Sequence, residues 1–478
     1  MIKKLLYILS LGAVFFIASC SEDRLQLLPE IGSPLEEAIN SENDMKQVLA
    51  GVYTQMSSSA GFGGAISIFG DLLSDNAFIS SSNDGYFLNT SRMTYSPEIS
   101  DFGMYDSFYD VIQQANMVIA DKKLAESPTV LNYKAEAKIA RAMAYFYLVS
   151  FYSASPKSGL NQEYGVPIQP EEYNPNNKLA RSSVNDVYNY IISDLQSAIN
   201  QLGNYQPENK STLSPTAAKL LLSRVYLTRG KNDDYQKSLD YAYEVINDNS
   251  GNYEFITDKN KYLNYFTSSN SAVMDNQKET VFEIEQTPIF NVGGNAHPGT
   301  FYANNGSHRS ILFRRSFVNQ LTSTPNDWRS GLIGVLGSDI DSPRGNFTRK
   351  WVRNTNEGNY ASNIKLLRVS EAYLNRIEAL FNIGNNAAAL DYLKAFQLNR
   401  GKTPDTTITL EIILNERRKE FFAEGHRYFD LKRNAFPIVK DSNCETNCNV
   451  SVTDRLFVIP IPYYEMNINS SITQYPGW

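Results

Sequence analysis

Five carboxyl and imidazole side chains near the C-terminal end of the sequence have the types and spacing needed for acid–base chemistry. They are Glu416, Glu420, Glu424, His426 and Asp430. The glutamates recur at every fourth residue, which places them on one face of a helix, and paired carboxylates near a histidine can transfer protons. Four basic residues lie among them: Arg417, Arg418, Lys419 and Arg427. We therefore interpret the segment as structural charge pairs between helices, on a helix that ends at Gly425.

No other pattern in the sequence is typical of an enzyme, a metal centre or a cofactor site. His297 and His308 lack the i, i+4 spacing of a helical metal site. A calcium loop that starts at Asp339 would place Lys350 at its twelfth position, where a bidentate glutamate is needed. The GxSxG, HExxH and Walker motifs do not occur. We predict that the protein is not an enzyme and uses no metal and no cofactor.

Two long loops, residues 57–104 and 250–365, carry residue types that bind carbohydrate. A pyranose ring stacks its C–H face on an aromatic ring, while its hydroxyl groups need polar partners at the edges. The predicted ligand contacts are Asn83, Asp84, Tyr86, Phe87 and Tyr95 in the first loop and Phe301, Tyr302, Asn304 and Arg309 in the second. The alternative for each aromatic residue is that it only packs its own loop.

Two other functions fit the same loops less well. A peptide ligand would need charge pairs, and the sequence has no deep basic or acidic cluster that would select a peptide by its ends. A surface glycosidase would need two opposed carboxylates, and the sequence does not identify such a pair. We rank a glycan first and a peptide second, and we interpret Trp328 and Trp351 as structural.

The N-terminal residues predict export and a lipid anchor. Lys3 and Lys4 precede a short apolar stretch, residues 5–17, which is typical of a secretory signal and too short for a spanning helix. The string FIASC puts small residues directly before Cys20, as in the lipobox of bacterial lipoproteins. We expect residues 1–19 to be removed, Cys20 to be acylated and residues 20–34 to form a tether. The alternative is an ordinary signal peptide with a chance cysteine.

Composition limits the remaining possibilities. The chain has 478 residues, of which 42% are apolar and 20% charged, and this balance excludes a disordered chain or a coiled coil. A net charge of −7 argues against nucleic acid as a partner. Apart from Cys20 the sequence contains Cys444 and Cys448, and we predict that these two form a local disulfide.

Helical periodicity must supply the framework that positions the loops. Amphipathic or aromatic helices are predicted over residues 41–56, 105–124, 135–152, 181–202, 214–230 and 235–246. The pair at 214–246 recurs at 366–399, with Gly230 and Gly384 in the turns, and such pairs resemble tetratricopeptide units. Strand-like pieces are few and short, such as residues 281–285. We predict a mainly α protein with one domain over residues 35–478.

Several stretches resemble the SusD/RagB-like outer-membrane lipoproteins of the Bacteroidetes. They are Ser21-Glu22-Asp23 after the lipobox, RAMAYFYLVSFY at 141–152 before Val166-Pro167, NERRKEFFAEGHRYFDLKR at 415–433, and IPIPYYEMNINSSITQYPGW at the end. One departure is that Arg24-Leu25-Gln26 stands where the family often has a Leu-Asp pair. The resemblance extends over nearly the whole chain in the expected order.

The resemblance implies a fold and a function. The fold would be a right-handed stack of tetratricopeptide-like helix pairs with loop-rich insertions. Such proteins are binding proteins that sit as lids on a SusC-like TonB-dependent transporter and hold a glycan or peptide before import. The expected location is the outer membrane, through N-terminal acyl chains, facing the cell exterior.

Overall fold

The computed structural model describes residues 38–174, 176–335, 346–354, 358, 360–441 and 443–478. The predicted signal peptide, Cys20, the tether and Asp339 lie outside the described residues. Every statement below concerns the described part of the chain.

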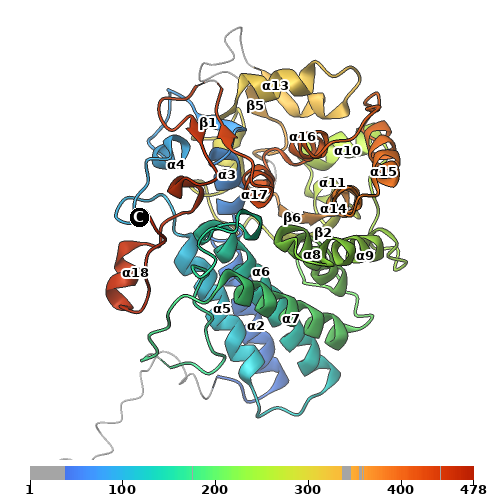
Figure 1. Cartoon of the computed structure of the whole chain (residues 1–478). Helices are drawn as coiled ribbons and strands as arrows, with labels where there is room; N and C mark the ends of the chain where they lie inside the picture. The colour runs from blue at the N-terminus through green and yellow to red at the C-terminus, as the bar shows by residue number, and fades with distance from the viewer. Residues whose placement is uncertain (1–37, 175, 336–345, 355–357, 359, 442) are drawn as a thin grey trace, which may run out of the picture.

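A stack of eight helices forms the framework of the described part of the chain (Figure 1). The members are α2 (Glu42–Met56), α5 (Met104–Ala120), α6 (Pro128–Tyr152), α7 (Val184–Leu202), α8 (Pro215–Arg229), α9 (Asp234–Ile246), α14 (Val369–Asn382) and α15 (Asn386–Leu398). Each helix from α5 to α9 packs on the next, α9 packs on α14, and α14 packs on α15. The two predicted helix pairs are therefore neighbours in the stack, and the mainly α fold is confirmed.

Local sequence signals fix the ends of these helices. Ser183 caps α7 by accepting a hydrogen bond from the backbone N–H of Asp186, and its hydroxyl donates to the Asp186 carboxylate at 2.6 Å. Ser214 caps α8 in the same way, and Gly230 ends that helix in the left-handed conformation, with φ 61°. Ser127 caps α6, which begins at Pro128, seven residues before its predicted start at residue 135.

Most aromatic side chains of α6 lie in the core. Tyr145, Tyr147, Phe151 and Tyr152 have 4% or less of their surface exposed, and α6 contacts α5 on one side and α7 on the other. The core is largely one connected cluster that extends from Ile39 to Ile472. The tyrosines at helical spacing thus bury apolar area between stacked helices.

The second predicted helix pair begins with a strand. Residues 366–368, which we predicted to be helical, belong to β6 (Ile364–Arg368), which pairs antiparallel with β2 (Thr280–Ile284). Backbone hydrogen bonds to β2 hold these residues extended, and α14 begins only at Val369. The strand predicted at 281–285 is present as β2.

The two predicted ligand loops contain short elements rather than irregular chain alone. The first holds α3 (Ala65–Leu72), β1 (Ala77–Ile79) and α4 (Leu88–Arg92). The second holds α10 (Lys259–Thr267), α11 (Ser271–Met274), α12 (Pro298–Tyr302), β3 (Ile311–Phe313), α13 (Arg315–Thr322), the 3₁₀ helix η4 (Trp328–Leu332), β4 (Ile333–Val335) and β5 (Asn346–Thr348). All eight residues of α3 are buried. The helix therefore has no exposed face, and the sequence lacks the alternation of apolar and polar positions by which a helix is recognised.

The C-terminal part supplies α16 (Leu410–Phe421), α17 (His426–Arg433), β7 (Ile438–Val439), β8 (Asn449–Val450) and α18 (Tyr463–Ile468). Two 3₁₀ helices, η3 (Pro156–Ser158) and η5 (Arg455–Phe457), complete the described elements. The sulfur atoms of Cys444 and Cys448 are bonded in the turn between β7 and β8, with the Cα atoms 5.7 Å apart. The bond closes this short turn at the edge of the molecule.

Helix α16 ends earlier than predicted. Its last residue is Phe421, so Glu424 lies in the turn, and Gly425 precedes α17 rather than ending α16. Gly425 has φ 80°, and a Cβ atom there would lie 2.1 Å from the carbonyl oxygen of Ile66 in α3. Because α3 approaches this turn so closely, only glycine fits at position 425, and the chain leaves the conformation of helix α16 before that residue.

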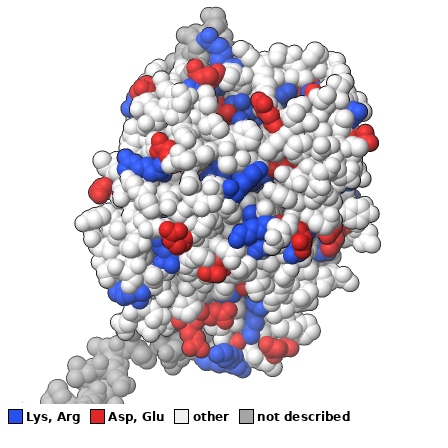
Figure 2. All heavy atoms as spheres, viewed as in Figure 1, with Lys and Arg blue, Asp and Glu red and all other residues white. Residues whose placement is uncertain are grey.

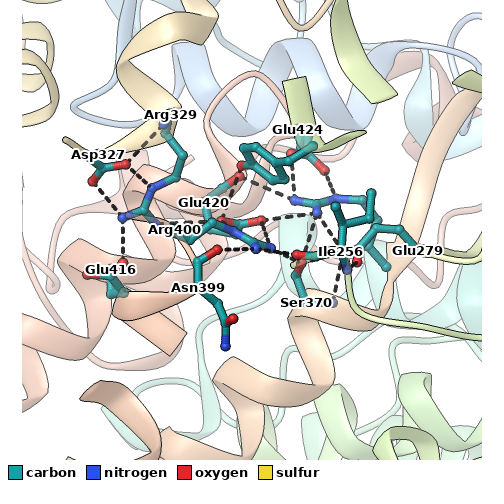
Figure 3. Close-up of polar contacts among 12 residues, drawn as sticks. Ile256, Glu279, Asp327, Arg329, Ser370, Asn399, Arg400, Glu416, Glu420 and Glu424 are labelled. Carbon is teal, nitrogen blue, oxygen red and sulfur yellow. Dashed lines mark hydrogen bonds and ion pairs between the residues drawn. The ribbon is translucent and has the colours of Figure 1, made fainter. Parts of the chain in front are cut away.

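The glutamates at 416, 420 and 424 form a buried charge network with three arginines from other elements (Figure 3). Arg329 donates to Glu416 at 2.6 Å, and Arg400 donates to Glu420 at 3.0 Å. Arg368 donates to Glu424 at 2.7 Å and to Glu420 at 3.2 Å. The glutamates therefore have the predicted structural role, but their cations come from other elements. Arg417, which lies among them in the sequence, pairs with Asp430 at 2.9 Å, and Arg427 pairs with Asp75 at 2.7 Å.

The network keeps its carboxylates ionised although they are buried. Burial by itself raises the pKa of Glu416, but the charges of Arg329 and Lys402 outweigh it and lower the pKa to about 2. The arginines around Glu420 likewise hold its pKa well below the usual range. Without its cationic partners, each buried carboxylate would strongly destabilise the folded protein.

Removing one carboxylate should destabilise the whole protein. We expect Glu420→Ala to lower the free energy of unfolding by about 3–5 kcal/mol, because Arg368 and Arg400 would lose a buried counter-ion. Urea denaturation measures the change. Glu411→Ala is the matched control, since Glu411 is exposed on the same helix, and should cost at most about 1 kcal/mol. Equal losses in the two variants would contradict a structural role for the network.

Candidate functional site

The pairing of β1 with β3 brings the two predicted ligand loops together. The ladder places Ile79 opposite Ile311, and the backbone N–H of Ser80 donates to the carbonyl of Ser310 at 2.8 Å. Because the strands are antiparallel, the chain after β1 and the chain before β3 leave the ladder at the same end. Residues 83–87 and residues 295–309 consequently lie beside each other, and we call them the paired loops.

His308 joins the two paired loops through one ring nitrogen and contacts its own loop through the other. Its Nδ1 lies 2.5 Å from Oδ2 of Asp84, and its Nε2 lies 3.0 Å from Oδ1 of Asn295. Its ring centroid is 4.8 Å from that of Tyr86. The Asp84 side chain is 59% exposed and that of His308 is 18% exposed, so the bridge lies at the surface, where a ligand can reach it.

A column of aromatic rings supports Tyr86 from below. Neighbouring centroids lie 5.1 Å apart for Tyr95 and Phe102, 4.9 Å for Phe102 and Phe69, 5.6 Å for Phe69 and Phe87, and 4.8 Å for Phe87 and Phe301. Tyr86 is the last ring of this series, and its centroid lies 5.4 Å from that of Phe301. Edge-to-face contacts of this kind stabilise each pair beyond simple burial and restrict the orientation of the half-buried Tyr86 ring.

Three of the predicted ligand contacts belong to the core instead. Tyr95, Phe301 and Tyr302 have at most 3% of their surface exposed. The hydroxyl of Tyr95 donates to the carbonyl of Leu456 at 2.6 Å, and that of Tyr302 donates to Asp71 at 3.0 Å. Their side chains cannot reach a ligand in this structure, so the prediction of direct contact is corrected to a supporting role.

The other predicted contacts lie at or near the surface. Asp84, Asn304 and Arg309 are exposed, whereas Tyr86, Phe87 and Asn83 are half-buried. Asn83 uses its amide to shape its own turn, by donating to the carbonyl of Ser80 and accepting from the N–H of Gly85. Tyr86 and Asp84 are therefore the predicted residues best placed to meet a ligand together.

Some residues of this surface were not among the predicted contacts. The sequence indicated His308 only as a possible metal ligand. In the second loop, Ser307 shares a hydrogen bond of 3.0 Å with the buried Tyr360. Only the β1–β3 pairing shows that Asn295 and His308 lie near residues 83–87, and no local sequence signal indicates that pairing.

The remaining chemical candidates have structural roles. His297 is buried, its Nε2 lies 3.0 Å from the carbonyl oxygen of Ser362, and burial lowers its pKa to about 4. Trp351 donates to the carbonyl of Ala423 at 2.8 Å, in agreement with its structural interpretation. Desolvation and the charges of Arg224 and Arg417 lower the pKa of His426 well below its usual range. Within the described ranges, no group of three or more His, Cys, Asp or Glu residues is arranged to hold a metal ion.

The paired loops present an aromatic ring beside amide, imidazole and carboxylate groups. Asp84 is paired with His308, and the carboxylate and amide oxygens here can accept hydrogen bonds from hydroxyl groups. Positive and negative side chains are interspersed over the face shown in Figure 2, without a broad region of one sign. Among the helices that the structure describes, none is long and apolar enough to cross a membrane.

Comparisons with known proteins agree with this fold. A family model described as "Starch-binding associating with outer membrane" matches residues 25–227, and the model of the SusD family matches residues 193–478. A SusD-like protein of Bacteroides ovatus is 26% identical over 69% of this chain and 64% of its own length. The starch-binding protein SusD of Bacteroides thetaiotaomicron is 23% identical over 77% of each chain.

Solved structures extend the likeness to nearly the whole chain. A SusD superfamily protein from Bacteroides thetaiotaomicron superposes with a TM-score of 0.81 and 26% identity, over 91% of this chain and 100% of that chain. A Bacteroides vulgatus protein, provisionally named as sugar binding, gives a TM-score of 0.83 and 29% identity over 92% and 99%. The helix stack, the loop-rich insertions and the matched family model lead to one conclusion: the chain belongs to the SusD family.

Proposed function

We propose that this protein is a cell-surface nutrient-binding lipoprotein that captures a glycan and delivers it to a SusC-like TonB-dependent outer-membrane transporter. The observation that carries the proposal is the surface of the paired loops, where Tyr86 stands beside Asp84, His308 and Asn295. An aromatic ring with hydrogen-bonding groups at its edge is the combination that a sugar ring requires. The family descriptions and the starch-binding relative support a glycan as the ligand.

A peptide held in the same lid role is the alternative. It would use the exposed Asp84 and Arg309 for charge pairs, but these side chains do not form a pocket for a terminal amine or carboxylate. A surface glycoside hydrolase is a weaker alternative. The buried Glu416, Glu420 and Glu424 are held by arginines, which leaves them unavailable to a substrate, and the proposed function is therefore binding without catalysis.

The proposed site predicts a specific loss on truncation of one ring. Tyr86→Ala should weaken retention in a glycan affinity gel by about five- to tenfold, because the stacking surface is lost. Tyr243→Ala, which removes an exposed tyrosine from α9, is the matched control and should leave retention unchanged. Tyr302 is unsuitable for this test, since its substitution would disturb the core. Equal retention by Tyr86→Ala and the wild type would place the glycan site elsewhere.

Lipid anchoring through Cys20 follows from the lipobox. Acyl chains contribute about 0.8 kcal/mol for each buried methylene, so two or more chains hold a protein firmly at a membrane. We expect Cys20→Ala to move the protein from the outer-membrane fraction to the soluble fraction. The double variant Cys444→Ala/Cys448→Ala keeps Cys20 and should stay in the membrane fraction. A Cys20→Ala protein that remains in the membrane would refute the anchor.

Delivery requires a partner in the same membrane. If the protein is the lid of a TonB-dependent barrel, a transporter of that class should co-purify with the wild-type chain from outer membranes dissolved in mild detergent. The Tyr86→Ala variant should retain the partner, because its loss concerns only the ligand. Purification of the wild-type chain alone, after chemical cross-linking in intact cells, would count against the lid role.

A further inference from the structure

A second cleft lies between α5 and the chain that follows α6, apart from the paired loops. Its volume is about 880 Å³, within the range of ligand pockets in proteins. Its walls come from α5 between Tyr109 and Ala120, from residues 121–123, and from residues 169–174 and Asn177, with Ile39 among the lining residues. None of the residues that line it belongs to the paired loops, so its occupant would be a separate one.

Hydrogen bonds to the helix stack hold the walls of this cleft in place. Asn116 of α5 donates to the carbonyl of Pro170 at 3.0 Å, and Tyr109 donates to the carbonyl of Pro167 at 2.8 Å. The buried Arg141 donates to Asn116 at 2.6 Å and pairs with Glu171 at 3.1 Å. Because buried side chains already fix this wall, little conformational entropy is lost in ordering it when a ligand binds.

The cleft offers uncharged hydrogen-bonding groups beside an exposed ring. The side-chain amides of Gln113, Gln169 and Asn177 make no hydrogen bond to any described residue, so their donors and acceptors are available. Tyr173 has 58% of its surface exposed at the rim. Five charged residues also line the cleft. Lys122 pairs with Glu172 at 3.2 Å, Glu171 pairs with the buried Arg141 at 3.1 Å, and the Asp121 carboxylate accepts a hydrogen bond from the backbone N–H of Leu124 at 3.1 Å. The fifth, Lys123, also has an interaction partner.

We propose that this cleft is a second binding site, for a neutral oligosaccharide. Free amides would bind hydroxyl groups, Tyr173 would stack on a sugar ring, and the paired charges disfavour an ionic ligand. The proposal rests on the proposed glycan-binding function and extends it from one site to two. A polysaccharide chain that reaches both sites would be held more tightly than by either site alone.

An array of neutral and acidic oligosaccharides, probed with full-length variants, tests the second site. In the Tyr86→Ala background, residual binding of at least one neutral oligosaccharide should remain. Adding Tyr173→Ala and Asn177→Ala should lower that residual signal about tenfold, which corresponds to about 1.4 kcal/mol. Tyr243→Ala in the same background is the control, since Tyr243 is as exposed as Tyr173. Melting temperatures of all variants should agree, because the substituted side chains are exposed or half-buried.

The other possible outcomes count against one of the two sites or against both. If Tyr86→Ala alone abolishes all binding, or if the added substitutions leave the residual signal unchanged, the second site is overturned. If Tyr86→Ala has no effect while Tyr173→Ala/Asn177→Ala in the wild-type background lowers binding, the paired loops fail and the second cleft stands. Binding of acidic oligosaccharides or peptides alone, or of nothing on the array, overturns the proposal.

Discussion

The buried network of Arg329, Arg368 and Arg400 with Glu416, Glu420 and Glu424 is the interaction on which the rest of the structure depends. The arginines come from η4, the end of β6 and the turn after α15, whereas the glutamates come from α16 and the turn behind it. Removing these charges from water is costly, and only complete pairing offsets the cost. The network therefore permits one relative placement of these elements, since any displacement would leave a charge unpaired.

A few hydrogen bonds also connect the elements of the charge network to the paired loops. Asp71, at the end of α3, accepts from the N–H of Ala423 at 2.8 Å and from the hydroxyl of Tyr302 at 3.0 Å. Burial raises the pKa of Asp71 to about 6. Tyr302 ends α12, which leads into the segment that carries His308. The turn after α16 is thus connected through Asp71 to the segment that carries the second of the paired loops.

The helices were predictable because their sequences carry both a period and a cap, as Ser183 and Ser214 do. The basic residues among the glutamates indicated a structural role, but the actual partners, Arg329, Arg368 and Arg400, lie in other elements and could not be named from the sequence. The secondary structure within the two loops was not predictable from the sequence. Helix α3 is buried on every side, and strands β1 and β3 are too short for an alternating pattern to be recognised. For the same reason, sequence could not separate Tyr86 from Tyr302: both stand in polar loops, and only tertiary packing makes one a surface ring and the other a core residue.

The Asp71–Tyr302 hydrogen bond joins residues 231 positions apart, and the Asp71–Ala423 bond joins residues 352 positions apart. Contacts of such long sequence separation form late in folding, because a long loop of chain must first be closed. A partly folded chain can contain correct helix pairs and yet lack the arrangement of the paired loops entirely. If the paired loops hold the ligand as proposed, binding reports that the whole polypeptide has folded.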